Sequence, residues 1–150
     1  MSDNRKKLKS IIFLVILVAL AFTGGILYVS TKKFTDITKE KVDYTINAFD
    51  LINEFTNNDS LANKKYAEKI ITVTGLVTEV ESADTTVNIK MADTTSGSYA
   101  IFAFQQQNLT EAKAIKEGDK VSIKGSCSGG AYSQILETEF ITFKRCALTK

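Results

Sequence analysis

The chain of 150 residues contains no histidine, tryptophan or proline, and only two cysteines. Histidine is the usual general base near neutral pH and the commonest metal ligand. Its absence excludes Ser-His-Asp catalysis and histidine-ligated metal sites. The remaining reactive side chains are carboxylates, hydroxyls and lysines, which show no convergent spacing. We therefore expect a protein that is not an enzyme, with no catalytic residue, no metal and no cofactor.

Arginine is also scarce where a nucleic-acid-binding surface would need it. Four of the 19 basic residues and one of the 17 acidic residues precede residue 30, so residues 30–150 contain 15 basic and 16 acidic groups. Arg145 is the one arginine among them. Nucleic-acid-binding domains usually have a basic stripe rich in arginine. The composition therefore argues against nucleic acid as a partner.

A long apolar run stands near the N-terminus. Residues 1–10 carry Arg5, Lys6, Lys7 and Lys9, and residues 11–29 follow as 19 mostly apolar positions. A helix of this length is about 28 Å long, close to the ~30 Å hydrocarbon core of a bilayer. The basic flank predicts a single-pass cell-membrane anchor with a cytoplasmic N-terminus and an extracytoplasmic C-terminal domain. The alternative is a cleaved signal peptide that secretes the domain, because residues 19–21 (ALA) fit a cleavage site.

The two cysteines are Cys127 and Cys146, separated by 19 positions. Outside the cytoplasm the natural interpretation of such a pair is a disulfide. Its loop would stabilise the domain by roughly 3 kcal/mol in the chain-entropy model. A reactive thiol pair is the alternative, although the spacing is not Cys-x-x-Cys and no histidine is present to lower a thiol pKa.

Residues 30–45 are polar and without period, which predicts a tether, and residues 46–150 form the domain. Asn47 is a plausible N-cap for a first helix. The apolar stripe of that helix has helical spacing; it consists of Ala48, Leu51, Ile52 and Phe55. A second short helix, capped by Asp59 or Ser60, is expected to end near Tyr66.

From Ile70 the apolar pattern changes to a period of two, which predicts strands. The expected elements are a long first strand bent at Gly75, a second strand over 87–91 and a third over 99–104. A helix after Asn108, a fourth strand over 120–126, a turn at Gly129 and Gly130, and a last strand over 134–146 follow. Five strands with a helix between the third and fourth are typical of the OB-fold, a mainly β Greek-key barrel.

Several segments carry a family resemblance. They are residues 51–55 (LINEF), 62–66 (ANKKY), 71–77 (ITVTGLV) and 118–125 (GDKVSIKG), with the flanking cysteines. Together they resemble the bacterial tRNA_anti-like OB-fold family over about residues 44–148. The resemblance implies a small protein with an N-terminal membrane anchor or signal and, in most members, no assigned function. The family name records fold similarity to anticodon-binding domains and does not imply tRNA binding.

OB-folds commonly bind ligands over strands two and three. Tyr99 begins the third strand and is the better surface candidate there, because Phe102 and Phe104 are expected to fill the barrel. Its candidate companions are Asn88 and Lys90 on the second strand. Tyr132 in the last hairpin completes the predicted ligand-binding set.

Glu137 and Glu139 stand two positions apart on the predicted last strand and so share a face. We expect that face to be solvated, because two carboxylates alone provide neither the ligand count for calcium nor a defined acid and base. The sequence as a whole predicts a membrane-anchored, extracytoplasmic OB-fold binding module that is not catalytic. Its partner would be a protein, a peptide or an oligosaccharide. A nucleic-acid-binding OB-fold domain is the alternative.

Overall fold

The computed structural model describes residues 15–21, 23–24, 36–104 and 106–149. The chain divides into two compact units, residues 1–35 and residues 36–150. In the first unit, residues 15–21, 23 and 24 are helical. The other positions of the predicted anchor, 11–14, 22 and 25–29, lie outside the described residues. Within the described ranges, no helix is long and apolar enough to cross a membrane.

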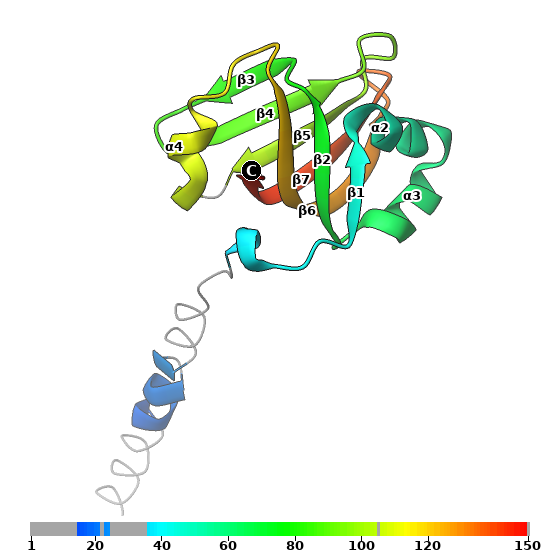
Figure 1. Cartoon of the computed structure of the whole chain (residues 1–150). Coiled ribbons are helices and arrows are strands. Elements are labelled where there is room, and N and C mark those ends of the chain that lie inside the picture. Colours follow the sequence, from blue (N-terminus) through cyan, green and yellow to red (C-terminus); the bar gives the residue numbers. More distant parts are fainter. Residues whose placement is uncertain (1–14, 22, 25–35, 105, 150) are drawn as a thin grey trace, which may run out of the picture. The chain divides into compact units, whose positions relative to one another are not determined.

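The second unit is mainly β, as the period-two patterns predict. Its helices are η1 (Ile37–Lys39), α2 (Ala48–Asn57), α3 (Asp59–Tyr66), η2 (Gln106–Asn108) and α4 (Leu109–Ala112). Its strands are β1 (Tyr44–Asn47), β2 (Ile70–Leu76), β3 (Glu79–Ser82), β4 (Val87–Ala92), β5 (Tyr99–Phe104), β6 (Lys120–Ser133) and β7 (Thr138–Leu148). Figure 1 shows α2 and α3 at one side of the curled sheet and α4 at the opposite side.

The strands form one mixed sheet in the order β1-β2-β6-β7-β5-β4-β3. The predicted long first strand is divided into β2 and β3 by Val77 and Thr78. The amide of Val77 donates to Asp119 beside β6, whereas the amide of Thr78 donates to Lys90 on β4. This single run of chain therefore pairs with β6 through its first half and with β4 through its second half. The order is that of an OB-like fold.

Two features separate this sheet from the predicted closed five-stranded barrel. β1 adds a parallel edge strand beside β2, which the sequence pattern did not reveal. The ladder is also open, because it ends in two edge strands, β1 and β3, that do not pair with each other. The added β1 and the division of the first strand into β2 and β3 give seven strands instead of five.

Helix α2 begins and packs as the sequence predicts. The Asn47 side chain accepts a hydrogen bond from the amide of Asp50, so Asn47 is the N-cap. The predicted apolar stripe of α2 is buried in the main core. Gly75 on β2 permits this packing, since a Cβ there would lie 2.7 Å from Ala48 Cβ and 2.8 Å from Met91 Sδ. The glycine therefore marks the close approach of α2 to the sheet.

Helix α3 ends at Tyr66 as expected, but its cap differs from the predicted Asp59 or Ser60. The side chain of Asn58 accepts from the amide of Leu61 and caps the helix. Asn58 is also the residue that ends α2, so one asparagine separates the two helices. Asp59 is the first residue of α3 itself.

The prediction of a turn at Gly129 and Gly130 is wrong. Both residues lie inside β6, and the β6–β7 turn falls at residues 134–137. The register of β6 against β7 shifts between Cys127 and Gly129, and Gly129 has a φ of +105°. A glycine at such a shift is the ordinary requirement of a bulge, because few other residues adopt this conformation.

The predicted disulfide is not formed in the structure: Cys127 and Cys146 are both free and buried. In the β6–β7 register Cys127 stands opposite Phe143, and the Sγ of Cys146 lies over Gly125. Cys127 and Cys146 are thus not register partners in this sheet.

The segment predicted as a tether packs against the domain where the structure describes it. Ile37 is fully buried and joins Ile70 and Ala147 in a small second core. The amine of Lys124, itself buried, donates to the carbonyl of Thr38 at 3.1 Å and to that of Glu40. Residues 30–35 of the predicted tether lie outside the described residues.

Candidate functional site

The outward face of β3, β4 and β5 carries three of the predicted ligand-binding residues. On β4, the side chains of Val87, Ile89 and Met91 are buried, and Asn88 and Lys90 alternate with them on the other face. On β5 the same alternation buries Phe102 and Phe104, as predicted, and leaves Tyr99 half-buried. The period of two therefore brings Asn88, Lys90 and Tyr99 to one surface.

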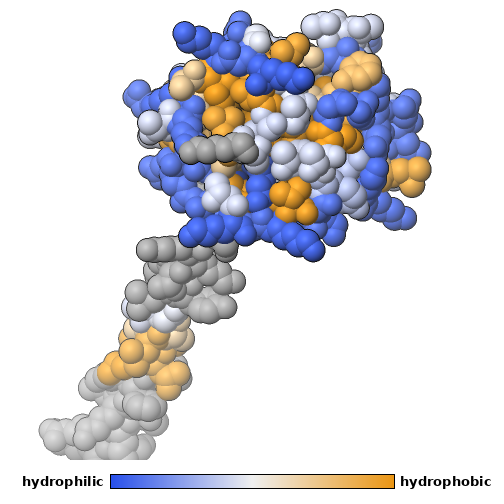
Figure 2. Space-filling view, viewed as in Figure 1, coloured by the Kyte–Doolittle hydropathy of each residue, from blue (hydrophilic) through white to orange (hydrophobic). Residues whose placement is uncertain are grey.

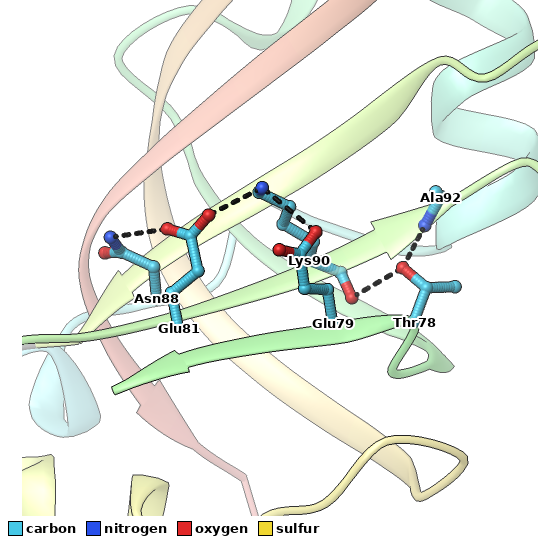
Figure 3. A network of polar contacts seen from close by, with 6 residues as sticks. All are labelled: Thr78, Glu79, Glu81, Asn88, Lys90 and Ala92. Carbon is cyan, nitrogen blue, oxygen red and sulfur yellow. Dashed lines mark hydrogen bonds and ion pairs between the residues drawn. The ribbon is translucent and has the colours of Figure 1, made fainter. Parts of the chain in front are cut away.

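Lys90 is held between two carboxylates of the neighbouring strand. Its Nζ lies 3.1 Å from Glu79 Oε2 and 2.7 Å from Glu81 Oε1. Asn88 Nδ2 donates to the second oxygen of Glu81 at 3.4 Å. The register places Glu79 opposite Lys90 and Glu81 opposite Asn88. Figure 3 shows the lysine amine between the two glutamates, with the amide beyond Glu81.

The network changes the acidity of its members. The hydrogen bond to Glu81, and to a smaller extent the one to Glu79, raises the pKa of Lys90. The hydrogen bonds from Lys90 and Asn88 lower the pKa of Glu81. The amine and the Glu81 carboxylate are both charged at neutral pH, and with Glu79 the cluster carries a net charge of about −1. A phosphate would meet net negative charge here.

Hydrogen bonds join the same site to Thr78, which lies between β2 and β3. The Thr78 amide and hydroxyl both donate to the carbonyl of Lys90, at 2.9 and 3.1 Å. The amide of Ala92 donates to the Thr78 hydroxyl at 3.1 Å (Figure 3). Thr78 therefore fixes the backbone of β4 directly beneath the Lys90 side chain.

An aromatic pair borders the ionic network. The rings of Tyr99 and Phe140 stack with centroids 6.4 Å apart and planes 26° apart. Lys90 Nζ lies 5.6 Å from the Tyr99 ring centroid, within cation–π range. Tyr99 and Phe140 are each half-buried, so part of each ring meets solvent. This arrangement offers a flat apolar contact beside two carboxylates.

The fourth predicted residue, Tyr132, lies elsewhere. It is on β6, is 54% exposed, and stands opposite Glu139 in the β6–β7 register. Together with the end of α2, it lines a hollow that is separate from the outward face of β3, β4 and β5. The structure thus brings together Asn88, Lys90 and Tyr99, but not Tyr132.

Sequence reasoning missed Glu79, Glu81 and Phe140. The two glutamates alternate with Val80 and so share one face of β3, a pattern that was visible in the sequence. Their meeting with Lys90 depends on the register across the β3–β4 turn, which the pattern alone does not give. Phe140 reaches Tyr99 because β5 and β7 pair in parallel, far apart in the chain.

A second feature of the surface is an apolar hollow of about 470 Å³ between the start of α2, β2 and β4. Phe49 and Leu76 on its border are 58% and 60% exposed. Figure 2 shows hydrophobic patches set in a mostly hydrophilic surface on the face in view. Among the residues that the structure describes, no three His, Cys, Asp or Glu side chains group as metal ligands.

The curled sheet, the divided first strand and the helix between β5 and β6 define an OB-like domain. The chain belongs to the tRNA_anti-like family, whose model matches residues 1–138. The resemblance noted in the sequence is thereby confirmed. None of the curated proteins matches the chain significantly.

Among solved structures, the chain is similar to the crystal structure of a "putative nucleic acid-binding lipoprotein" from Klebsiella pneumoniae. The TM-score is 0.56 and the identity 18%, over 70% of this chain and 91% of that one. An OBody bound to hen egg-white lysozyme gives a TM-score of 0.43 at 13% identity, over 57% and 86% of the two chains. The first likeness shows a shared fold.

Proposed function

We propose that the OB-like domain is a non-catalytic module that binds a protein or peptide partner on the outward face of β3, β4 and β5. In this proposal the domain is extracytoplasmic and is anchored in the cell membrane by residues 11–29. The observation that carries the choice of partner is the pairing of Lys90 with Glu79 and Glu81. OB-folds commonly bind over this face, and here its lysine is already neutralised.

The charge of the face favours protein over nucleic acid. A phosphate backbone is bound chiefly by uncompensated lysine and arginine. The two glutamates around Lys90 leave an excess of negative charge. The Tyr99–Phe140 pair beside them supplies the partly exposed aromatic surface that is enriched at protein interfaces. A partner with apolar and basic side chains would match both features.

A photo-crosslinking experiment tests this proposal. Ala103 is exposed on β5 and stands opposite Asn88, so a photoreactive amino acid there reports on the proposed face. The matched control is Lys64, which is exposed on α3. In the producing cells we expect a protein adduct from position 103 and none from position 64. Equal adducts from both positions, or none from position 103, would contradict the proposal.

Nucleic acid is the second candidate, and a specific observation favours it: the similar Klebsiella pneumoniae structure is described as a "putative nucleic acid-binding lipoprotein". Retention of the purified chain on single-stranded DNA or RNA, lost as salt rises, would support this candidate. If binding also fell in a Tyr99→Ala variant, the ligand would be nucleic acid on the same face. Absence of binding at low salt would exclude it.

Anchoring is tested separately from the ligand. The N-terminal sequence of the mature protein distinguishes a membrane anchor from a cleaved signal peptide at residues 11–29. An uncleaved N-terminus together with protease digestion of the domain from the outer side of the membrane would support the anchor. A mature chain that begins at Phe22 would instead indicate a secreted domain.

A further inference from the structure

Glu139 is a carboxylate buried on β7. The side chain was expected on a solvated face, and this expectation is wrong: Glu139 is only 3% exposed. It lies on the face of β7 that also buries Ile141 and Phe143. Its Oε1 has no hydrogen-bond partner among the described residues. An unpaired buried carboxylate is costly, so its presence calls for a compensating group.

Glu139 borders a hollow of about 420 Å³ between the end of α2, the start of α3 and the β6–β7 hairpin; we call it the Glu139 pocket. Asp59, at the start of α3, also lines it. Burial raises the pKa of Glu139, and the negative charge of Asp59 raises it further by a smaller amount. No ion pair among the described residues involves Glu139 or Asp59. No lysine or arginine lines the pocket.

The rest of the pocket also suits positive charge. The last turn of α2, through Asn57, borders it, and the C-terminal end of a helix is the negative end of its dipole. The N-terminus of α3 also borders the pocket, and there the Asn58 cap on the Leu61 amide and the first-turn carboxylate of Asp59 oppose its positive end. The exposed ring of Tyr132 stands opposite Glu139 and supplies an aromatic face at the rim.

We propose that the Glu139 pocket binds an organic cation, an ammonium or guanidinium group presented by a lysine or arginine side chain or by a free amine. Two carboxylates, helix carbonyls and an aromatic face are what such a group contacts. Calcium is the less suitable cation, because it takes six to eight oxygen ligands and no third carboxylate of the described residues joins Glu139 and Asp59. The pocket opens on the opposite side of β7 from Phe140, so this proposal does not depend on the outward face of β3, β4 and β5.

The test is a titration of the full-length chain with two free amines, agmatine and cadaverine, and with calcium chloride. Binding is followed by calorimetry and by chemical-shift changes of the Tyr132 and Glu139 amides. A short peptide with one arginine between apolar residues is compared with agmatine. Tighter binding of the peptide assigns the cation to a polypeptide, and equal binding assigns it to a free amine.

Glu139→Gln and Glu137→Gln form a matched pair of variants. Glu137 is exposed in the turn two positions away. We expect Glu139→Gln to weaken amine binding at least tenfold and Glu137→Gln to change it less than twofold. We also expect the melting temperature of Glu139→Gln without ligand to equal or exceed that of the parent, because the variant removes an unpaired buried charge.

Tyr132→Ala should weaken binding several-fold without changing the melting temperature, since the ring is mostly exposed. Three outcomes would overturn the proposal. One is the absence of amine or peptide binding at millimolar concentration. Another is equal loss in the Glu137→Gln and Glu139→Gln variants. The third is binding of calcium, dependent on Glu139, without binding of the amines.

Discussion

Asn63 of α3 pairs with the backbone of Gly130 in β6 through two hydrogen bonds. Its Nδ2 donates to the Gly130 carbonyl and its Oδ1 accepts from the Gly130 amide, both at 2.9 Å. The two residues are 67 positions apart. One side chain thus satisfies a backbone donor and a backbone acceptor next to the bulge at Gly129, and it fixes α3 against the sheet.

Asn63→Ala should lower the free energy of unfolding by about 1–3 kcal/mol, because two backbone groups of Gly130 lose their partner. Urea denaturation measures the change. Lys64→Ala is the matched control, since Lys64 is exposed on the same helix. Its effect should stay within about 0.5 kcal/mol. Equal losses in the two variants would show that the Asn63 hydrogen bonds contribute nothing.

Gly130→Ala should destabilise the domain by about 1–3 kcal/mol through overpacking. A Cβ at this position would lie 2.5 Å from Cδ1 of Phe55, whose ring is 1% exposed and cannot move into solvent. In the background of Phe55→Leu, which removes the contacting ring carbons, the same glycine substitution should lose less stability. A double-mutant cycle in urea measures this coupling. Strictly additive losses would contradict the steric explanation.

Local periodicity explains what the sequence could predict. The apolar stripe of α2, the cap at Asn47 and the inward rings of Phe102 and Phe104 each depend on residues within one turn or one strand. Glu139 also follows a local rule, because it alternates with Ile141 and Phe143 on the buried face of β7. Its charge suggested a solvated position, and the period of two would have given the correct one.

The rest of the fold and site depends on contacts between distant segments. Gly129 and Gly130 resemble a turn in the sequence. Inside the strand, Gly129 is required by the positive φ of the bulge, and Gly130 by the close packing of Phe55. The partners of Lys90 follow from the β3–β4 register. The stacking of Tyr99 on Phe140 follows from the parallel β5–β7 pairing. Neither register is encoded in one stretch of residues.

The cysteines should behave as two protected thiols. Burial raises the pKa of Cys127 to about 11 and also raises that of Cys146. Iodoacetamide at about pH 8 should therefore modify neither cysteine in the native chain and both after unfolding in guanidinium, because only the thiolate reacts. Mass spectrometry counts the adducts. A native mass lower by two hydrogen atoms, with no adduct after unfolding, would establish a disulfide.

The same pKa shifts predict a loss of stability in mild alkali. Between about pH 9 and pH 10 the unfolded chain releases thiol protons that the folded chain retains. Since the folded state then binds more protons, the free energy of unfolding falls with rising pH, by on the order of 1 kcal/mol per pH unit for each thiol. Urea denaturation at several pH values measures the slope. The double variant Cys127→Ala, Cys146→Ala should flatten it, and an unchanged slope would exclude the thiols as its cause.

Lys124 should decide whether residues 36–40 stay on the domain. Its buried amine donates to the carbonyls of Thr38 and Glu40, and the Glu40 carboxylate pairs with Arg145 at 2.9 Å. Lys124→Met keeps most of the side-chain volume but removes the donor, so the segment should separate more often from β6 and β7. Hydrogen exchange of the Lys39 and Glu40 amides should then accelerate at least tenfold. In Lys120→Met, an exposed lysine of the same strand, it should remain unchanged. Equal exchange in both variants would show that the Lys124 hydrogen bonds do not hold the segment in place.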